Sequence, residues 1–449
     1  MMITRRSFKE ILQVAPILLG VLGYYFMGFE IDRAQSYILI PLYLALFFTS
    51  FPLIFKGYSI KQMFWAGILF RLIFLLSTPL LSQDFFRFLW DGMLLTNGLN
   101  PYEATPDLLN QTSALFSTQF SQELYNGMGT LSSAHYSNYP PINQWGFYLA
   151  SLVGGNSVLA NLISIRVVLI LSDLGVFWFG IKLLDYLNLS KKRIGLYFLN
   201  PLIIIELTGN LHWEGFMMFF FLFGLYLIFT KDEWKWATIP MAASIATKLI
   251  PLLILPLFWR FLKPKKSILF GALILLCLLM FFVPFFLGDN NLSHYLKTIG
   301  LWFNRFEFNG SIYYVIREIG FEVKGYNIIR KLGKISPYII VAIVAVFTFI
   351  RNNKTPKALL TGMLFCLSSY FFIATTVHPW YIVSLVCIAI FTNYSYPLIW
   401  SGLVVLSYAT YGNSDFNENY YLIGLQYGIV YGVFLYELIQ RKSLLHHFK

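Results

Sequence analysis

The chain has 449 residues, of which 57% are hydrophobic and only 12% charged, and its mean hydropathy is +0.65. This composition excludes an ordinary soluble domain and predicts an all-α polytopic membrane protein. The net charge of +12 does not indicate nucleic acid, because most lysines and arginines fall in short clusters between apolar runs, as membrane topology requires.

Apolar runs of about 20 residues, the length of a transmembrane helix, recur along the whole chain. We expect one integral-membrane domain, residues 1–449, with about 12–14 transmembrane helices. A pair of short helices is predicted between 236 and 261, because this interval is too short for two full spans. The full spans are expected near 11–29, 36–55, 63–82, 158–181, 194–209, 215–230, 267–287, 336–350, 358–376, 380–393, 397–411 and 420–439.

The basic clusters all fall on one side of the membrane if the N-terminus is cytoplasmic. Examples are Arg5–Lys9, Lys191–Arg193 and Arg260–Lys266. This distribution predicts a multi-pass protein of the cytoplasmic (inner) membrane with its N- and C-termini in the cytoplasm. It leaves two extracytoplasmic segments, residues 83–157 and 288–336, and the first is expected to carry amphipathic helices.

The first outer segment opens with Asp84-Phe-Phe-Arg-Phe-Leu-Trp-Asp-Gly92, whose period is that of an amphipathic helix. A helix here brings Asp84, Arg87 and Asp91 onto one face. Two interpretations remain open. The charges face a cavity, or they serve the helix itself, with Asp84 as its cap and Arg87 paired to Asp91. The helix is expected to end before the turn Asn100-Pro-Tyr102.

Other polar residues interrupt apolar runs on the predicted outer side. Tyr139 stands in Tyr-Pro-Pro, His212 and Glu214 lie in a very short connection between two spans, and Lys248 lies at the tip of the predicted hairpin. Each has a structural alternative: an interfacial turn, exposed loop residues, and a lysine that snorkels to the interface. An ammonium at such a tip is costly unless it meets an anion, which favours a functional role.

The second outer segment carries Arg305, Asn309 and a basic run that violates the positive-inside tendency. Anionic headgroups or a lipid phosphate would account for this run. A later break in an apolar stretch, on the same side, holds His378 and Trp380. A lone histidine is more often structural, but the indole suits packing on a sugar or an isoprenoid.

Polar residues from distant parts of the chain therefore project to one face. That convergence predicts a functional site. The set comprises Asp84, Arg87, Asp91, Tyr139, His212, Glu214, Lys248, Arg305 and His378.

At these residues the chain resembles the GT-C membrane glycosyltransferases, specifically the bacterial polyprenyl-phosphate-mannose-dependent mannosyltransferases and the related GPI mannosyltransferases. The family commonly has two adjacent acids where this chain has Gln83 before Asp84, which puts a role for a second carboxylate in doubt. The resemblance covers most of the chain in order. It rests on Asp84–Gly92, Asn100–Tyr102, Tyr139–Pro141, Asn210–Glu214, Lys248 with Pro251 and Pro256, and His378–Tyr381.

The resemblance implies a GT-C-like helical bundle and an inverting glycosyltransferase. Such an enzyme would move a hexose, here mannose, from a polyprenyl-phosphate donor to a hydroxyl of a lipid-linked or glycan acceptor on the outer face. Asp84 would be the catalytic base, and Arg87, Lys248 and His378 would bind the donor phosphate. Substrate binding is expected of Asp91, Tyr102, Tyr139, His212, Glu214, Arg305, Asn309 and Trp380.

The expected partners are the polyprenyl-phosphate sugar, the glycolipid or glycan acceptor and membrane lipids, and no nucleic acid is expected. No cofactor is required and no metal motif is evident, although a divalent ion shared by Asp84 and the phosphate stays an open alternative. The alternative function is a multi-span lipid or sugar transporter or flippase. It is disfavoured because we see no internal repeat, and the polar residues gather at one surface instead of the midplane.

Overall fold

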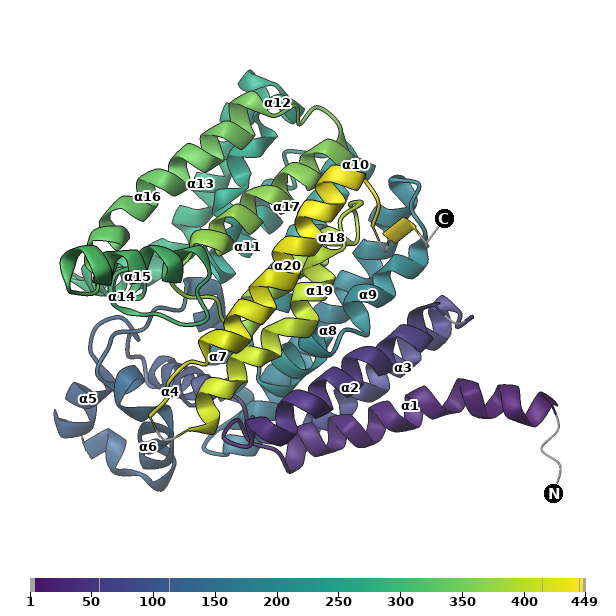
Figure 1. Cartoon of the computed structure of the whole chain (residues 1–449). Helices are drawn as coiled ribbons and strands as arrows, with labels where there is room; N and C mark the ends of the chain where they lie inside the picture. Colours follow the sequence, from purple (N-terminus) through teal and green to yellow (C-terminus); the bar gives the residue numbers. More distant parts are fainter. Residues whose placement is uncertain (1–4, 56, 113, 414, 444, 447–449) are drawn as a thin grey trace.

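The structure is a computed structural model, and it describes residues 5–55, 57–112, 114–413, 415–443 and 445–446. Within these ranges the chain is helical, with no strand and a single β-bridge between Phe308 and Thr376. The prediction of an all-α membrane protein is confirmed. Figure 1 shows long helices side by side, with a cap of shorter helices at one end, at the lower left.

The cap is formed by α4, α5 and α6, and it interrupts the series of long helices in the first half of the chain. The helices of this half are α1 (Arg5–Phe29), α2 (Ser36–Phe55), α3 (Ile60–Ile73), α4 (Asp84–Thr96), α5 (Pro106–Thr112), α6 (Gln119–Ser133), α7 (Pro141–Gly154), α8 (Val158–Tyr186), α9 (Gly195–Phe198), α10 (Glu214–Thr230) and α11 (Thr238–Thr247).

The second half of the chain adds further long helices to the bundle and ends with α20. Its helices are α12 (Phe258–Leu262), α13 (Pro264–Phe286), α14 (Asn291–Arg305), α15 (Ile312–Lys324), α16 (Ile329–Ala345), α17 (Pro356–Ile373), α18 (Ile382–Ala389), α19 (Tyr396–Leu403) and α20 (Tyr420–Gln440).

Among the described residues, six helices are long and apolar enough to cross a membrane, or seven if the bent pair 203–209 and 214–230 is one span. The number is below the 12–14 expected, because several apolar runs fold as shorter pieces. Proline disfavours a helical residue before it, and the runs near 63–82, 194–209 and 380–393 contain or adjoin Pro79, Pro201 and Pro379.

Helix α4 begins at Asp84, as predicted, and packs against α6 and α7. Its first turn is supported by Ser82, whose hydroxyl oxygen accepts a hydrogen bond from the Asp84 N–H at 3.3 Å. A close approach to α7 requires glycine at position 92, because a Cβ there would lie 2.5 Å from the Phe147 carbonyl oxygen. The helix ends at Thr96, so its length fits the sequence prediction.

The connection between the two arms of the bent span is buried. Residues 203–209 form a π-helix, and α10 leaves it at an angle of 109°. The bend places His212 and Glu214 inside the protein, with exposures of 2% and 0%. The alternative that these two are exposed loop residues is therefore wrong.

The interval after Trp236 forms the predicted pair of short helical segments. Helix α11 ends at Thr247, Lys248 is extended (φ −149°, ψ 140°), and two short 3-10 turns lead into α12. Because α11 packs against α7, α10 and α13, the Lys248 junction is held against the α4–α7 end of the molecule.

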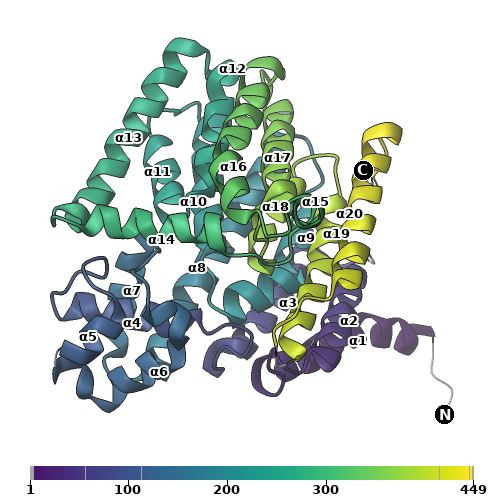
Figure 2. The ribbon, with the colours of Figure 1, turned by 60° about the vertical axis from the view of Figure 1, so that its left-hand side comes forward.

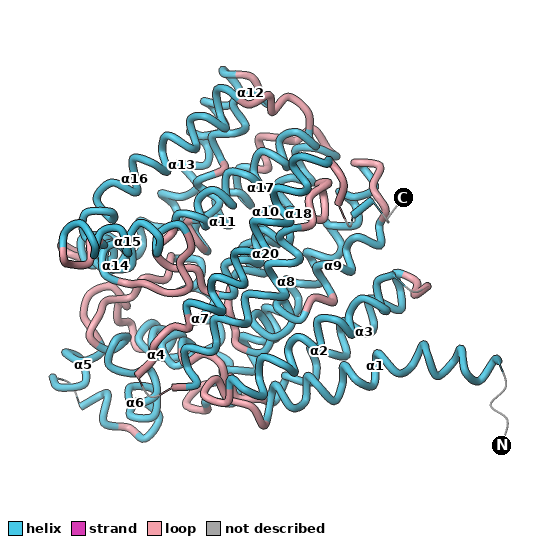
Figure 3. The backbone as a smooth tube through the Cα atoms, viewed as in Figure 1, coloured by secondary structure: helices cyan, strands magenta, loops and turns pink. Residues whose placement is uncertain are grey.

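Helix α14 runs crosswise at the ends of α13 and α16 (Figure 2), and it contacts both. Loops gather between this end of the bundle and the α4–α7 layer, where pink segments cluster in Figure 3. Segments from both halves of the chain therefore meet at one end of the molecule.

Candidate active site

A cavity of about 530 Å³ lies where these segments meet. Its walls come from the loops around residues 81–84, 128–140, 248–253 and 370–381, together with part of α14. The predicted convergence of distant segments on one site is thus present. Six of the predicted site residues line this cavity: Asp84, Arg87, Tyr139, Lys248, His378 and Trp380.

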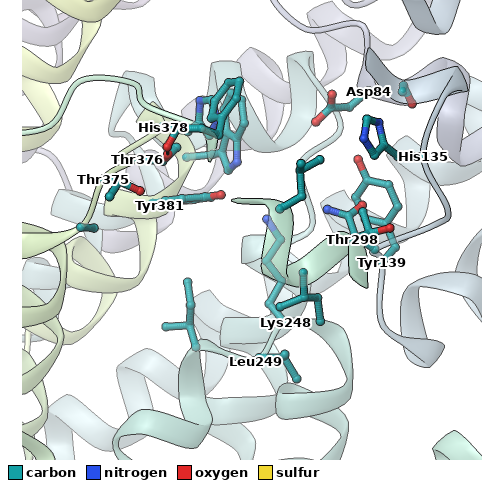
Figure 4. Close-up of a pocket in the computed structure, with 18 of the residues that line it drawn as sticks. Asp84, His135, Tyr139, Lys248, Leu249, Thr298, Thr375, Thr376, His378 and Tyr381 are labelled. Atoms are coloured by element: carbon teal, nitrogen blue, oxygen red, sulfur yellow. Dashed lines mark hydrogen bonds between the residues drawn. The ribbon is translucent and has the colours of Figure 1, made fainter. Parts of the chain in front are cut away.

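Asp84 projects into the cavity from the first turn of α4 (Figure 4). Burial raises the pKa of its carboxyl group, while the nearby cations Lys248 and Arg33 and a hydrogen bond from Tyr139 pull the pKa down. In the described part of the chain Asp84 forms no ion pair. Its carboxylate can therefore accept a proton from a group bound in the cavity.

Arg87 lines the cavity, but its hydrogen bonds are made to other groups of the protein. Its Nε donates to Asp91 at 2.7 Å, and one terminal nitrogen donates to the carbonyls of Ser132 and His135 at 2.8 and 2.9 Å. The pairing of Arg87 with Asp91, one of the two alternatives from the sequence, is present. The other terminal nitrogen, Nη2, is buried without a protein partner in the described structure.

Asp91 lies behind the cavity and not on its wall. It is fully buried and accepts hydrogen bonds from Ser137 at 2.6 Å and from Gln144 at 2.9 Å, besides the one from Arg87. With three donors around it, Asp91 ties α4 to the loop before α7. Its position suits support of the site more than contact with a substrate.

Lys248 reaches the cavity from the end of α11 (Figure 4). Its ammonium pairs with the carboxylate of Glu214, which is fully buried at the start of α10. The second carboxylate oxygen of Glu214 has no hydrogen-bond partner in the described structure. We expected an anion near Lys248, and the carboxylate of Glu214 in the neighbouring helix α10 is that anion.

His378 and Trp380 form the wall opposite the cap. Burial, with a further contribution from Lys248, lowers the pKa of His378 to about 3, so its imidazole is neutral at physiological pH. The Trp380 ring stacks on His378 with ring centroids 4.5 Å apart, and His212 stacks on the other side of Trp380 at 3.7 Å. His212 therefore sits behind this wall and does not line the cavity.

Tyr139 and Tyr102 belong to one aromatic group on the cap side. The Tyr102 hydroxyl donates to the Tyr139 carbonyl, and its ring packs on Phe286 with centroids 4.8 Å apart. Tyr139 packs edge-on against Phe88, with centroids 4.9 Å apart. Tyr139 reaches the cavity (Figure 4), whereas Tyr102 is fully buried beneath it.

Of the two residues predicted in the segment 288–336, Asn309 does not line the cavity. Asn309 is fully buried, donating to the Val377 carbonyl at 3.2 Å and accepting from Gln426 at 3.2 Å. It joins the loop before α15 to the His378 turn and to α20. The side chain of Arg305 lies outside the described structure.

Arg33 and Gln83 also belong to the cavity wall, although neither was among the site residues predicted from the sequence. Arg33, from the α1–α2 connection, lines the cavity and donates to the Gln83 side chain at 2.8 Å, and Gln83 in turn donates to the Met128 carbonyl at 3.1 Å. A basic residue in a short loop that the predicted topology places outside departs from the positive-inside tendency. That signal was available in the sequence.

Glu206, which is buried in the π-helix, was likewise not predicted from the sequence. It accepts a hydrogen bond from Tyr408 at 2.7 Å and lies 3.6 Å from the imidazole of His212. Nothing in its local sequence distinguishes it from a residue at a span end. In the described chain, no group of three or more His, Cys, Asp or Glu side chains is arranged to hold a metal ion.

The comparison with known proteins identifies the family. A family model, described as "Alpha-(1->6)-mannopyranosyltransferase, N-terminal domain", matches residues 33–262, just over half of the chain. The chain is also similar to alpha-(1->6)-mannopyranosyltransferase A of Mycobacterium tuberculosis, at 27% identity over 145 residues. That alignment covers 32% of this chain and 26% of the relative, so it spans about a quarter of the relative's length.

The matched range begins at Arg33 and contains Asp84, Glu214 and Lys248, while the His378 turn lies beyond it. The helical membrane fold, the cavity with its carboxylate, and this match agree with one another. The chain belongs to the alpha-(1->6)-mannopyranosyltransferase family, which are membrane glycosyltransferases.

Proposed function

We propose that this protein is an inverting glycosyltransferase that moves a hexose, mannose by its family, from a polyprenyl-phosphate donor to a hydroxyl of a lipid-linked or glycan acceptor. The observation that carries the proposal is the cavity itself. It places a carboxylate without an ion pair, Asp84, in the same space as a lysine and a neutral imidazole, Lys248 and His378.

The cavity has an apolar side that suits a polyprenyl chain. Aliphatic side chains from the hairpin after α11, from α14, from α16 and from α17 cover this side. Burial of such a chain is favourable at roughly 25 cal/mol per Å² of apolar surface. The residues concerned are Leu249, Leu252, Leu253, Ile299, Ile340 and Ile373.

The transfer requires a base and a stabilised leaving group. The acceptor hydroxyl attacks the anomeric carbon of the donor sugar while Asp84 takes its proton. The bond between the anomeric carbon and the phosphate oxygen breaks, and its electron pair stays on the phosphate. Lys248 and His378 donate hydrogen bonds to the oxygen that gains charge. A single displacement of this kind inverts the configuration.

The proposed orientation follows from the charge distribution. The cytoplasmic clusters would place the cavity on the extracytoplasmic face of the inner membrane, where polyprenyl-phosphate sugars and an acceptor can enter from the bilayer. No cofactor takes part in the proposed reaction. Membership of a mannosyltransferase family favours this enzyme over the transporter alternative.

Asp84→Asn tests the proposal, because it keeps the size of the side chain and removes its basicity. Turnover with a polyprenyl-phosphate mannose donor should fall about a hundredfold or more in purified protein. Asp289→Asn, at an exposed carboxylate in the α13–α14 connection, is the matched control and should keep parental turnover. Near-parental activity of Asp84→Asn would refute the assignment of the base.

A further inference from the structure

Four aromatic rings from three separate segments form one stack at the cavity wall. His212 stacks on Trp380, Trp380 on His378, and His378 on Phe308. The centroid distances are 3.7, 4.5 and 4.9 Å, and the angles between neighbouring planes are 19°, 7° and 27°. The stack therefore runs from the buried bend before α10 to the loop before α15.

Both ends of the stack are fixed by hydrogen bonds. Phe308 exchanges backbone hydrogen bonds with Thr375 and Val377, at 3.1 and 2.8 Å. At the other end the His212 backbone N–H donates to the Glu206 carbonyl at 3.1 Å, while its Nε2 lies 3.6 Å from the Glu206 carboxylate without a hydrogen-bond partner in the described structure. Backbone hydrogen bonds thus hold the two outer residues, and ring contacts hold their side chains.

The inner imidazole is likewise held by ring contacts. His378 is 9% exposed, and its Nδ1 is buried without a hydrogen-bond partner in the described structure. Stacked and edge-on ring contacts, from Trp380, Phe308 and Tyr381, surround it. Such contacts fix the plane of a ring without a directional hydrogen bond. One of these rings, Trp380, itself rests on His212.

We propose that His212, which does not touch the cavity, is a positioning residue that sets the plane of His378 through the indole of Trp380. The proposal rests on the proposed function in one respect, since it assigns His378 to the donor phosphate. A catalytic group displaced by about 1 Å can lose up to a hundredfold in rate. For turnover, the flat shape of the side chain at position 212 should therefore matter more than the polarity of that side chain.

The first experiment compares two replacements of His212 that differ in shape. His212→Phe keeps a flat ring against Trp380, whereas His212→Leu keeps apolar volume without one. We expect His212→Leu to lower turnover about tenfold or more, and His212→Phe to stay within about threefold of the parent. If His212→Phe and His212→Leu lose turnover equally, the proposal is overturned, because the flat ring at position 212 would then make no difference.

The second experiment asks whether His212 acts through His378. In a His378→Ala background, His212→Leu should cause no further loss of turnover, because residues that act as a unit are not additive. The control is His294, which stacks behind the cavity residue Tyr136 with centroids 3.8 Å apart. The effect of His294→Leu should be the same in both backgrounds. An undiminished His212→Leu effect in the His378→Ala background would contradict the proposal.

A third measurement needs no substrate, and so separates the positioning role from the proposed function. The rate at which diethyl pyrocarbonate modifies His378 is followed by mass spectrometry of the purified protein, with the exposed His446 as internal reference. His212→Leu should raise the relative rate at His378 severalfold, and His212→Phe should not. An unchanged rate in His212→Leu would overturn the positioning role, even if turnover responds to Asp84→Asn as proposed.

Discussion

Four charged side chains of the described structure line the cavity, and they differ in how their charge is balanced. Arg87 and Lys248 each have a carboxylate partner, whereas Asp84 and Arg33 have no ion pair. A charge with a carboxylate partner is balanced before a ligand binds, so Lys248 would share its ammonium between Glu214 and a donor phosphate, whereas a charge without an ion pair meets no such competition. At the scale of single residues, this balance separates Asp84 and Arg33 from their neighbours.

The raised pKa of Asp84 predicts a pH dependence. Below its folded-state pKa the carboxyl group is protonated and cannot act as a base, so kcat/KM should fall as the pH falls through that value. Burial places this fall at a higher pH than for an ordinary aspartate. Arg33→Gln removes a cation that pulls the pKa down, so the fall should move to still higher pH.

Lys61→Gln, at an exposed lysine near the start of α3, is the control for the effect of Arg33 on the pH profile. It should leave the pH profile of kcat/KM unchanged. Superimposable profiles for the parent and Arg33→Gln would show that Arg33 does not influence the base.

Binding of the donor should depend on Lys248 and His378, whereas proton transfer should depend on Asp84. Lys248→Ala and His378→Ala should each weaken binding of a non-hydrolysable lipid-phosphate analogue about tenfold to a hundredfold, since a hydrogen bond to a charged group contributes roughly 1.5–3 kcal/mol. Asp84→Asn should leave this affinity nearly intact. The measurement is the dissociation constant of the analogue in purified protein.

Lys248→Ala leaves the carboxylate of Glu214 buried without its cation, which by itself destabilises the fold. The double variant Lys248→Ala, Glu214→Gln removes that complication, and it should recover stability without recovering affinity. Parental affinity in the Lys248 and His378 variants would make both residues structural and move the search for the phosphate site to the basic run of 317–334.

At the scale of elements, helix α4 carries the proposed base, and its position depends on a buried network. Asp91 accepts hydrogen bonds from Arg87, Ser137 and Gln144, and so joins α4 to the loop before α7 and to α7 itself. The backbones approach closely at Gly92. These two contacts fix α4 against α7, and with it the position of Asp84 at the start of the helix.

Asp91→Ala should therefore lower the free energy of unfolding by about 3–5 kcal/mol, because it leaves a buried guanidinium without its carboxylate. The matched control is Asp185→Ala, which breaks the pair with Lys191 in which both side chains are well exposed, at 62% and 42%. That change should cost about 0–1 kcal/mol. Unfolding of the purified protein by denaturant titration in detergent measures both, and equal small effects would contradict the role given to Asp91.

The whole molecule places the cavity at one end of the bundle. The cap with α5 lies at the lower left of Figure 1, and α12 lies at the opposite, upper end. The basic clusters of the sequence lie toward α12 and the ends of the chain, so the positive-inside tendency would put the cavity outside the cell. This orientation is a proposal that a labelling experiment can decide.

Single cysteines at two exposed positions, Gln111→Cys in α5 and Lys265→Cys in α13, test the orientation. The native cysteines Cys277, Cys366 and Cys387 are first replaced by alanine. An impermeant maleimide applied to intact cells should label only the cysteine at 111. Labelling at 265 instead would reverse the topology and place the cavity on the cytoplasmic side.

The amino-acid sequence by itself determined the features that depend on local pattern. An apolar run predicts a helix, a charge periodicity predicts one face of α4, and a short interval between basic clusters predicted the hairpin that carries Lys248. These features were predicted because neighbouring residues specify them. The polar segments were also predicted this way. Of the six predicted residues that line the cavity, Asp84, Arg87 and Tyr139 come from the first of these segments, and Lys248, His378 and Trp380 come from breaks in apolar runs.

Only the tertiary structure decided which polar residues face the cavity and which lie behind it. Glu214 pairs with Lys248 from 34 positions away, and Asp91 is enclosed by donors from the loop and helix that follow the cap. A carboxylate in a short loop has the same local pattern in either role. Whether a carboxylate faces the cavity or lies behind it depends on which distant helix brings a hydrogen-bond partner within reach. The residue spacing within one segment does not show which helix that is.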